Sequence, residues 1–471
     1  MADHRLGFQS FEEEPAPTAL DVEGELPEWL TGTLLRNGPG LFDVGDEPLT
    51  HWFDGFALLR RFRFDDGIEY SSRFLRSEAY MSAARGELAF PEFGTNPPRS
   101  LLDRVHEFVG DELTDNAALT VRHRDGEFRA VTETAREHAF DPDELTTLGE
   151  RREEVSATTT LGHDHYDPLQ EERVGLGIDF GRASGSGYVV YRDPDDGPIE
   201  GITRIDVAEP AYMHSFALTD HYVVLTEHPL TVSPRRFLGD RPFIENYRWY
   251  PERGTRFLVI DRRTGETVAS PSVPSFFTFH HVNAYERGNE LVLDLVAFED
   301  HSIVEALSLS TLRSSSPNVP GGEFRRYRIY LDGGTATGET LFPGPIAFPT
   351  THYAEANTHP YRYCYGVGKD PGSFNDRLHK IDVEHVTDEA WEEEGLHPGE
   401  PLFVPEPDGD EEDDGVLLSV ALDAEKERSC VLVLDAAAFE EIARAYLPSA
   451  LPFDFHGSFY LDGENPTPSM T

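Results

Sequence analysis

The sequence predicts an all-β protein, and three observations support this fold class. Short runs of β-branched and aromatic residues recur along the whole chain, each followed by turn-forming residues. Helical patterns are few and short. No change in composition divides the 471 residues into separate domains. Many short strands in a chain of this length are typical of a β-propeller, in which successive sheets form blades around a central axis.

Five segments have the strand pattern most clearly: Phe56–Phe64, Phe257–Asp261, Glu290–Val296, Arg326–Tyr330 and Cys430–Leu434. The strongest helical pattern runs from Ala436 to Tyr446, behind Asp435, whose side chain can cap a first helical turn. We therefore expect one propeller domain over residues 1–471, with a few short helices. Residues 1–25 are expected to form an N-terminal extension and residues 460–471 a C-terminal tail.

The composition indicates a salt-adapted protein. The formal net charge is −47, and Lys369, Lys380 and Lys426 are the only lysines. At molar salt the screening length falls to about 3 Å, which removes most of the self-repulsion that such a charge causes. We therefore expect a very salty cytoplasm, such as that of a halophilic archaeon. An acidic partner-binding face is the alternative, but the acidic residues are spread along the whole chain. Nucleic acid is not an expected partner, because no basic patch is present to neutralise phosphates.

The cysteines and the N-terminus indicate the compartment. Cys364 and Cys430 are the only cysteines, which favours a reducing environment over a disulfide framework. The first ten residues lack the basic and apolar pattern of a secretory signal. No uninterrupted apolar run approaches the roughly 20 residues that span a bilayer. We expect a soluble, cytoplasmic protein.

Four histidines lie in similar local sequences. His163, His214, His280 and His456 are each flanked by aromatic or β-favouring residues, as expected at the inner end of a strand. They are separated by 51, 66 and 176 residues. In a seven-bladed propeller with about 60 residues per blade, these gaps correspond to one, one and three blades. One histidine from each of four inner strands could then converge on the axis.

Four converging imidazoles would suit a transition metal. Imidazole is the commonest protein metal ligand and binds in its neutral form. Four neutral ligands would leave the metal's charge uncancelled and could leave coordination positions free, an arrangement that suits iron(II) handling dioxygen. The chain has 19 histidines, so a single one could equally be a capping, surface or core residue. A zinc hydrolase is less favoured, because catalytic zinc usually takes three protein ligands.

Several longer stretches carry a resemblance to a known family. They include Gly32–Gly40, His51–Leu59 and Pro251–Asp261, together with all four histidine contexts. From about Thr31 to Gly457 the sequence resembles the carotenoid cleavage oxygenases, in the branch of the animal β-carotene oxygenases and the retinal pigment epithelium isomerase. The resemblance implies a seven-bladed propeller with iron(II) on its axis and loops capping the iron-bearing face. It also implies that His163, His214, His280 and His456 bind the iron.

The resemblance further implies glutamates that accept hydrogen bonds from ligand histidines, which fixes the ring orientation and raises ligand basicity. Glu133 matches the partner of His214, and Glu400 matches the partner of His456. The chain departs from the family at two places. It has Ala347-Phe348-Pro349 where the family has Glu-Phe-Pro, so we expect His280 to lack a carboxylate partner. It has Asp164, beside His163, where the family usually has proline.

The activity implied by the resemblance is oxidative cleavage of a conjugated double bond by O2, held in a long apolar tunnel. Phe279 is the one lining residue that we name. Central cleavage of β-carotene to retinal is the preferred reaction. Cleavage of an apocarotenoid, eccentric cleavage of another carotenoid and ester isomerisation remain alternatives within the family. Outside it, the alternative is a non-catalytic propeller that binds a pigment or a partner.

Because a long polyene dissolves in membranes, we also expect peripheral membrane contact through the aromatic segment Phe237–Ile244. No obligate protein partner is inferred.

Overall fold

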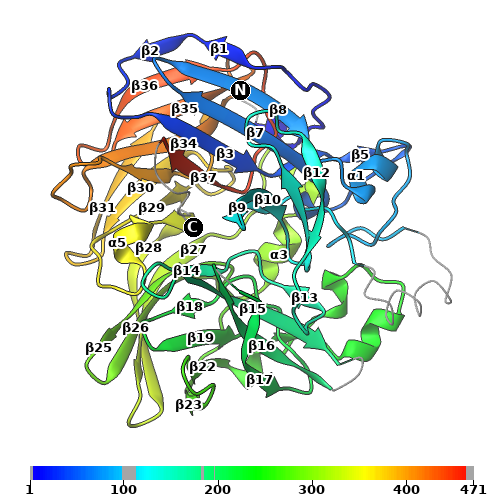
Figure 1. Ribbon diagram of the computed structural model, residues 1–471, viewed down its shortest axis with the longest axis vertical. Helices are drawn as coiled ribbons and strands as arrows, with labels where there is room; N and C mark the ends of the chain where they lie inside the picture. Colours follow the sequence, from blue (N-terminus) through cyan, green and yellow to red (C-terminus); the bar gives the residue numbers. More distant parts are fainter. Residues whose placement is uncertain (1–3, 98–112, 182–184, 196, 463–471) are drawn as a thin grey trace.

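The computed structural model describes residues 4–97, 113–181, 185–195 and 197–462. Within these ranges the chain forms antiparallel sheets arranged in a ring, with inner strands such as β9, β14, β18 and β37 near the centre (Figure 1). The sheets form seven blades, as in the seven-bladed propellers that the chain resembles in structure. The predicted all-β propeller is confirmed.

The blades follow the chain around the ring. Blade 1 consists of β37 (His456–Leu461), β3 (Gly32–Asn37), β7 (Phe56–Phe64), β8 (Ile68–Phe74) and β1 (Thr18–Leu20), with β4 (Pro39–Leu41) beside β7. Blade 2 consists of β9 (Thr120–Arg124), β10 (Glu127–Val131), β11 (Arg136–Phe140) and β12 (Thr147–Arg152). Blade 3 consists of β13 (Thr159–Thr160), β14 (His165–Asp167), β15 (Glu172–Phe180), β16 (Ser186–Pro194) and β17 (Glu200–Asp206).

Blade 4 consists of β18 (Ala217–Leu218), β19 (Tyr222–Glu227), β22 (Thr255–Asp261), β23 (Thr267–Ala269) and β24 (Ser272–Val273). Blade 5 consists of β25 (His281–Arg287), β26 (Glu290–Ala297), β27 (Gly322–Tyr330) and the first part of β28 (Thr335–Thr350). Blade 6 consists of the end of β28, β29 (Tyr363–Gly368), β30 (Arg377–Asp382) and β31 (Thr387–Glu392). Blade 7 consists of β32 (Leu396–Pro398), β33 (Leu402–Pro405), β34 (Gly415–Asp423), β35 (Arg428–Asp435), β36 (Glu440–Tyr446) and β2 (Val22–Gly24).

The strand β28 links two blades. Its residues from Thr335 to Ile346 pair with β27, whereas Ala347 and Thr350 pair with β29. Both ladders, β27–β28 and β28–β29, contain register shifts near this change of partner. The first part of β28 therefore belongs to blade 5, and its end forms the inner strand of blade 6. Ala347, the site of the missing glutamate, therefore lies on an inner strand.

The ring is closed by both ends of the chain. The C-terminal strand β37 pairs with β3 along its whole length, from His456 opposite Asn37 to Leu461 opposite Gly32. Within the first 25 residues, β1 pairs with β8 of blade 1 and β2 pairs with β36 of blade 7. Hydrogen bonds of the N-terminal segment thus hold the outer edges of both terminal blades.

Several hydrophobic clusters lie between neighbouring blades. Leu34 and Phe62 of blade 1 share one cluster with Leu418 and Val433 of blade 7. Other clusters join blades 4 and 5, blades 6 and 7, and blades 1 and 2. The five predicted strands lie in β7, β22, β26, β27 and β35, and each of them has an apolar face in these clusters.

The predicted helix at 436–446 is wrong. Asp435 does cap a local turn, because its carboxylate accepts from the backbone N–H of Ala438 at 2.7 Å. The chain then enters β36, where Ala443 and Ala445 pair with β35 and pack in the core between blades 1 and 7. Tertiary pairing with β35 and β2 overrides the helical preference of alanine.

The few helices lie in the connections. They are η1 (His4–Phe8), η2 (Trp52–Asp54), α1 (Glu78–Ala83), η3 (Pro234–Leu238), η4 (Ile244–Asn246), η5 (Pro251–Arg253), α3 (Ser302–Ala306), α4 (Leu309–Leu312) and α5 (Tyr353–Ala356). Two short ladders, β5 (Asp43–Val44) with β6 (Glu47–Pro48) and β20 (Leu230–Thr231) with β21 (Arg248–Trp249), complete the described elements. Among the described residues, no helix is long and apolar enough to cross a bilayer.

Candidate metal centre

The four histidines lie at the inner ends of four blades. His163 lies between β13 and β14 of blade 3, and His214 lies three residues before β18 of blade 4. His280 directly precedes β25 of blade 5, and His456 is the first residue of β37 in blade 1. Because the innermost strands of a propeller run beside the axis, residues at their ends face a common point.

The structure brings these side chains together. One ligand-type nitrogen of each imidazole lies within 4.8 Å of the corresponding atom of the other three. The Nε2 atoms of His163 and His214 are 3.1 Å apart. The rings of His163 and His456 meet edge to face, with centroids 4.5 Å apart, and His280 meets both His163 and His456 at 5.3 Å. Four neutral nitrogens at this separation fit a single transition-metal ion.

The cluster is shielded from water, which favours neutral imidazoles. His163, His214 and His456 are buried. Burial lowers the pKa of His280 well below its usual range, and the neighbouring imidazoles of His214 and His163 lower it further. Burial likewise lowers the pKa of His456. The Nε2 atom of His280 is buried and has no hydrogen-bond partner within the described structure, as expected of an atom that points at a metal site.

Two of the histidines are held by carboxylates. The Nδ1 atom of His214 lies 2.6 Å from Glu133 Oε1, and the Nδ1 atom of His456 lies 2.6 Å from Glu400 Oε1. Tyr212 also donates to Glu133, at 3.2 Å. In each pair the carboxylate accepts from Nδ1–H, so Nε2 is the nitrogen left to face the centre.

The support of His456 extends into a buried ion network. Arg36 donates to the second oxygen of Glu400 and, through Nη2, to Asp454 at 2.7 Å. Arg60 lies 3.8 Å from the other oxygen of Asp454. The side chains of Arg36, Arg60, Glu400 and Asp454 are each at most 2% exposed. Glu400 is therefore fixed on both of its oxygens.

The position of Ala347 leaves His280 without such support. Among the described residues, no side chain or carbonyl accepts a hydrogen bond from the His280 ring. The next residue, Phe348, has a φ of 48° and places its ring against His280 and His456, with centroids at 5.8 and 5.4 Å. Packing with Phe348 takes the place of a charged partner at His280. By contrast, the adjacent His281 is hydrogen-bonded on both nitrogens, to Ser215 and Thr226.

Asp164, the other departure from the family pattern, is part of a second buried ion cluster. Its carboxylate accepts from Arg122 Nη1 at 2.6 Å, and Arg122 also pairs with Glu137 and Glu153, at 2.8 and 3.3 Å. Burial raises the pKa of Glu153 to about 7. Arg122 lies on β9 of blade 2, so this cluster ties the loop that carries His163 to the neighbouring blade.

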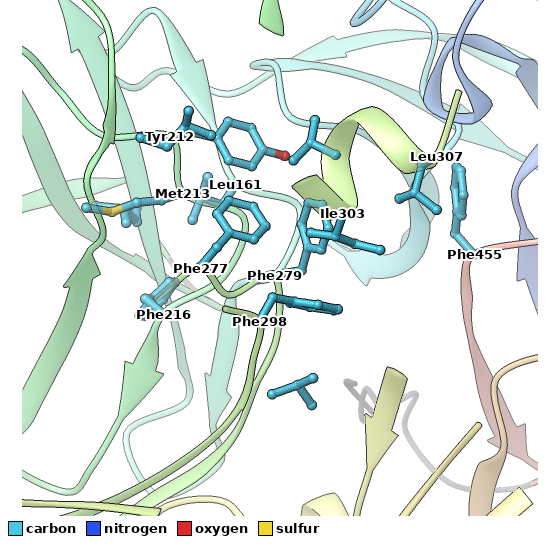
Figure 2. Packing of buried hydrophobic residues seen from close by; sticks show 14 of the residues in the cluster. Leu161, Tyr212, Met213, Phe216, Phe277, Phe279, Phe298, Ile303, Leu307 and Phe455 are labelled. Atoms are coloured by element: carbon cyan, nitrogen blue, oxygen red, sulfur yellow. The ribbon is translucent and has the colours of Figure 1, made fainter. Parts of the chain in front are cut away.

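A cavity of about 280 Å³ opens beside the histidines, lined by His214, His280 and His456. Figure 2 shows part of its apolar wall, which includes Phe279, Phe298 and Ile303. Phe279 meets the His214 ring edge to face at 5.4 Å. A second cavity, lined by His163, Thr350 and Tyr353, measures about 20 Å³, which is room for roughly one water. Of these two cavities, only the larger can admit an organic substrate.

Sequence reasoning missed the roles of Arg36 and Tyr212. The segment Arg36–Gly40 looks like a turn, because its glycines and proline dominate the pattern. The signal that could have drawn attention to Arg36 is an arginine directly after two leucines in a strand, because a buried arginine needs a carboxylate partner. Tyr212 lies two residues before His214, outside any strand, and the side chains of both residues contact Glu133.

Comparisons with known proteins agree with this geometry. The family model described as "Retinal pigment epithelial membrane protein" matches residues 7–461. A mitochondrial carotenoid-cleaving dioxygenase of Mustela putorius furo is 32% identical, with 95% of this chain and 94% of the relative covered. A carotenoid isomerooxygenase of Galleria mellonella is also 32% identical, covering 97% and 96%. A chloroplastic carotenoid cleavage dioxygenase 8 homolog of Oryza sativa subsp. japonica is 36% identical, covering 96% and 84%.

Solved structures show the same relationship. A cobalt-substituted apocarotenoid oxygenase of Synechocystis superimposes with a TM-score of 0.84 at 26% identity, covering 97% of this chain and 98% of that one. A chimera of that oxygenase with the retinal pigment epithelium protein reaches a TM-score of 0.85 over the same shares.

Proposed function

The chain belongs to the retinal pigment epithelial membrane protein family, which includes the carotenoid-cleaving dioxygenases, and on that basis we propose that it is an iron(II)-dependent carotenoid dioxygenase. The observation that carries the proposal is the convergence of four imidazole nitrogens within 4.8 Å beside an apolar cavity. The reaction would add O2 across a conjugated double bond and yield two carbonyl products.

The four histidines would hold the metal, since their donor set fits a divalent transition ion. Glu133 and Glu400 would keep the Nδ1 protons of His214 and His456 in place, so that both Nε2 atoms remain available as ligands. Iron(II), when bound there, would supply the electron density that activates dioxygen.

The cavity would position the substrate. Its aromatic and aliphatic lining, including Phe279 and Phe298, would exclude water and hold a polyene by its faces. Phe279 packs against the ring of His214, so a double bond brought to the centre would lie against Phe279. The choice of bond to be cut then depends on how far each end of the polyene reaches into the cavity.

Central cleavage of β-carotene to retinal is the first candidate reaction, because a salt-adapted source with retinal proteins would need it. Cleavage of an apocarotenoid is the second candidate reaction, and the observation that favours it is a lysine in the cavity wall, Lys369.

The protein would act in the cytoplasm. The segment around η3 supports peripheral membrane contact, because Phe237 and Phe243 line the cavity while Leu238 is 37% exposed. Flotation with lipid vesicles at several salt concentrations tests this contact.

The central experiment is product analysis. Protein loaded anaerobically with iron(II) is mixed with β-carotene or an apocarotenal in the presence of O2, and the aldehydes are identified by mass. Retinal, or another defined pair of carbonyl products, supports the dioxygenase. An isomerised product with unchanged mass would instead indicate isomerase chemistry. Folded protein that binds polyenes but contains no metal would indicate a non-catalytic binding propeller.

A further inference from the structure

One wall of the cavity is apolar except for the side chain of a single lysine. Residues of blades 5 and 6 form this wall: Val319, Pro345, Ala347, Gly368 and Lys369. Lys369 directly follows β29, whose residue Val367 pairs with Ala347. Arg241, at the wall formed by the loop after η3, is the other cation in the lining, and it is exposed. Lys369 is therefore the only partly buried cation among the described residues that line the cavity.

The three lysines of the chain have different surroundings. Lys380 pairs with Asp413 at 2.6 Å, and Lys426 pairs with Asp423 at 3.1 Å. Lys369 forms no ion pair within 4 Å among the described residues, although the chain has 87 acidic residues for 40 basic ones. The nearby Asp376 is engaged elsewhere, by Arg377 and by the backbone N–H of Asp370.

The ammonium of Lys369 has unused hydrogen-bonding capacity. Its Nζ atom donates to the backbone carbonyl of Val319 at 2.5 Å, and an ammonium has three N–H donors. Burial lowers the pKa of Lys369, as expected for a cation beside an apolar cavity. A hydrocarbon placed against this group would strip its remaining hydration without offering an acceptor, which is unfavourable. An oxygen atom in the same place would accept a charge-assisted hydrogen bond.

We propose that Lys369 is a specificity-determining residue that binds an oxygen atom at the end of the polyene lying along the wall of blades 5 and 6. The ligand class is a carotenoid or apocarotenoid whose end carries a hydroxyl or carbonyl group. This inference rests on the proposed function, since it assigns one end of the substrate of that same site. Ala347 lines the same wall with a methyl group.

The test compares two polyenes with the same carbon skeleton, β-carotene and its 3,3′-dihydroxy derivative zeaxanthin. Binding is followed by quenching of tryptophan fluorescence, since Trp52 lines the cavity, and cleavage is followed by product formation. Wild-type protein should prefer zeaxanthin. K369M should weaken zeaxanthin binding and kcat/KM by roughly 10-fold, the loss expected for a hydrogen bond to a charged group, and should leave β-carotene unchanged or improved.

Two further variants complete the design. K426M removes a surface lysine and serves as the matched control for the loss of one charge. K369Q keeps a donor at the same position and should retain part of the preference, which also covers the case in which K369M does not fold. The inference would be overturned if K369M changed binding and kcat/KM equally for both polyenes, or if neither polyene quenched the tryptophan fluorescence. If wild-type protein binds zeaxanthin preferentially but cleaves neither polyene, the proposed activity fails and the oxygen-binding role of Lys369 stands.

Discussion

His456 and His280 face the same point but are supported in different ways. His456 donates to Glu400, which is itself fixed by Arg36 within a network that includes Asp454 and Arg60. Within the part of the chain that the structure describes, His280 has no carboxylate partner and is held by its backbone position and by the ring of Phe348. The difference shows that one side of the centre is held by charge and hydrogen bonds, while the other depends on packing alone. Metal affinity should therefore respond unequally to changes on the two sides.

The largest effect is expected from removal of one of the four clustered histidines. H456A and H280A should each abolish near-stoichiometric iron binding, because three imidazoles without further anionic ligands hold iron(II) weakly. Metal content of purified protein measures this effect, and circular dichroism checks that the fold remains. H281A is the matched control, because His281 is bonded to Ser215 and Thr226 and lies outside the cluster. Full iron occupancy in either ligand variant would contradict the assignment.

The next effect concerns the carboxylates. E400Q should lower metal affinity by about 10–100-fold, the range typical for loss of an outer partner of a ligand. It should also lower thermal stability, because it unbalances the buried charges of Arg36 and Asp454. E133Q should lower affinity with a smaller loss of stability, since the Glu133 side chain is 23% exposed and lies outside that network. Cobalt(II) titration measures the metal affinity, and thermal melts measure the stability. Equal destabilisation by E400Q and E133Q would show that the buried ion network around Glu400 does not add to stability.

A substitution at Ala347 can give His280 the kind of carboxylate partner that His456 has. A347E should supply the absent acceptor to His280 and tighten metal binding by up to about 10-fold, provided that the carboxylate reaches Nδ1. A347Q, of equal size but uncharged, separates the effect of charge from that of filling the cavity. Unchanged affinity in A347E, with the fold retained, would show that His280 needs no carboxylate in this protein.

The smallest expected effect is at Asp164. D164N should loosen the loop that carries His163 and lower metal affinity by less than the 10-fold typical of a direct partner. Stability should change little, because Arg122 keeps Glu137 and Glu153 and loses one of three clustered negative charges. A loss of affinity as large as that of E400Q would place Asp164 on a level with the carboxylates that touch the ligands.

The sequence was sufficient for the parts of the molecule that depend on local pattern. The five strands and the propeller architecture follow from β-favouring runs and turns, and the histidine contexts indicated which four side chains to bring together. The helix expected at 436–446 failed because pairing with β35 and β2 decides that segment. The partners of Arg36 and Asp164 could not be identified from sequence, since they lie 364 and 42 residues away. The role proposed for Lys369 likewise depends on its position in the cavity wall, which the sequence does not show.

The most direct measurement is a crystal structure of the iron-loaded protein with anomalous diffraction collected at the iron edge. The account predicts one strong peak among the Nε2 atoms of His163, His214, His280 and His456, and loss of that peak in H456A. A peak at another site, or well-ordered protein with four converging histidines and no bound metal under anaerobic iron(II), would contradict it.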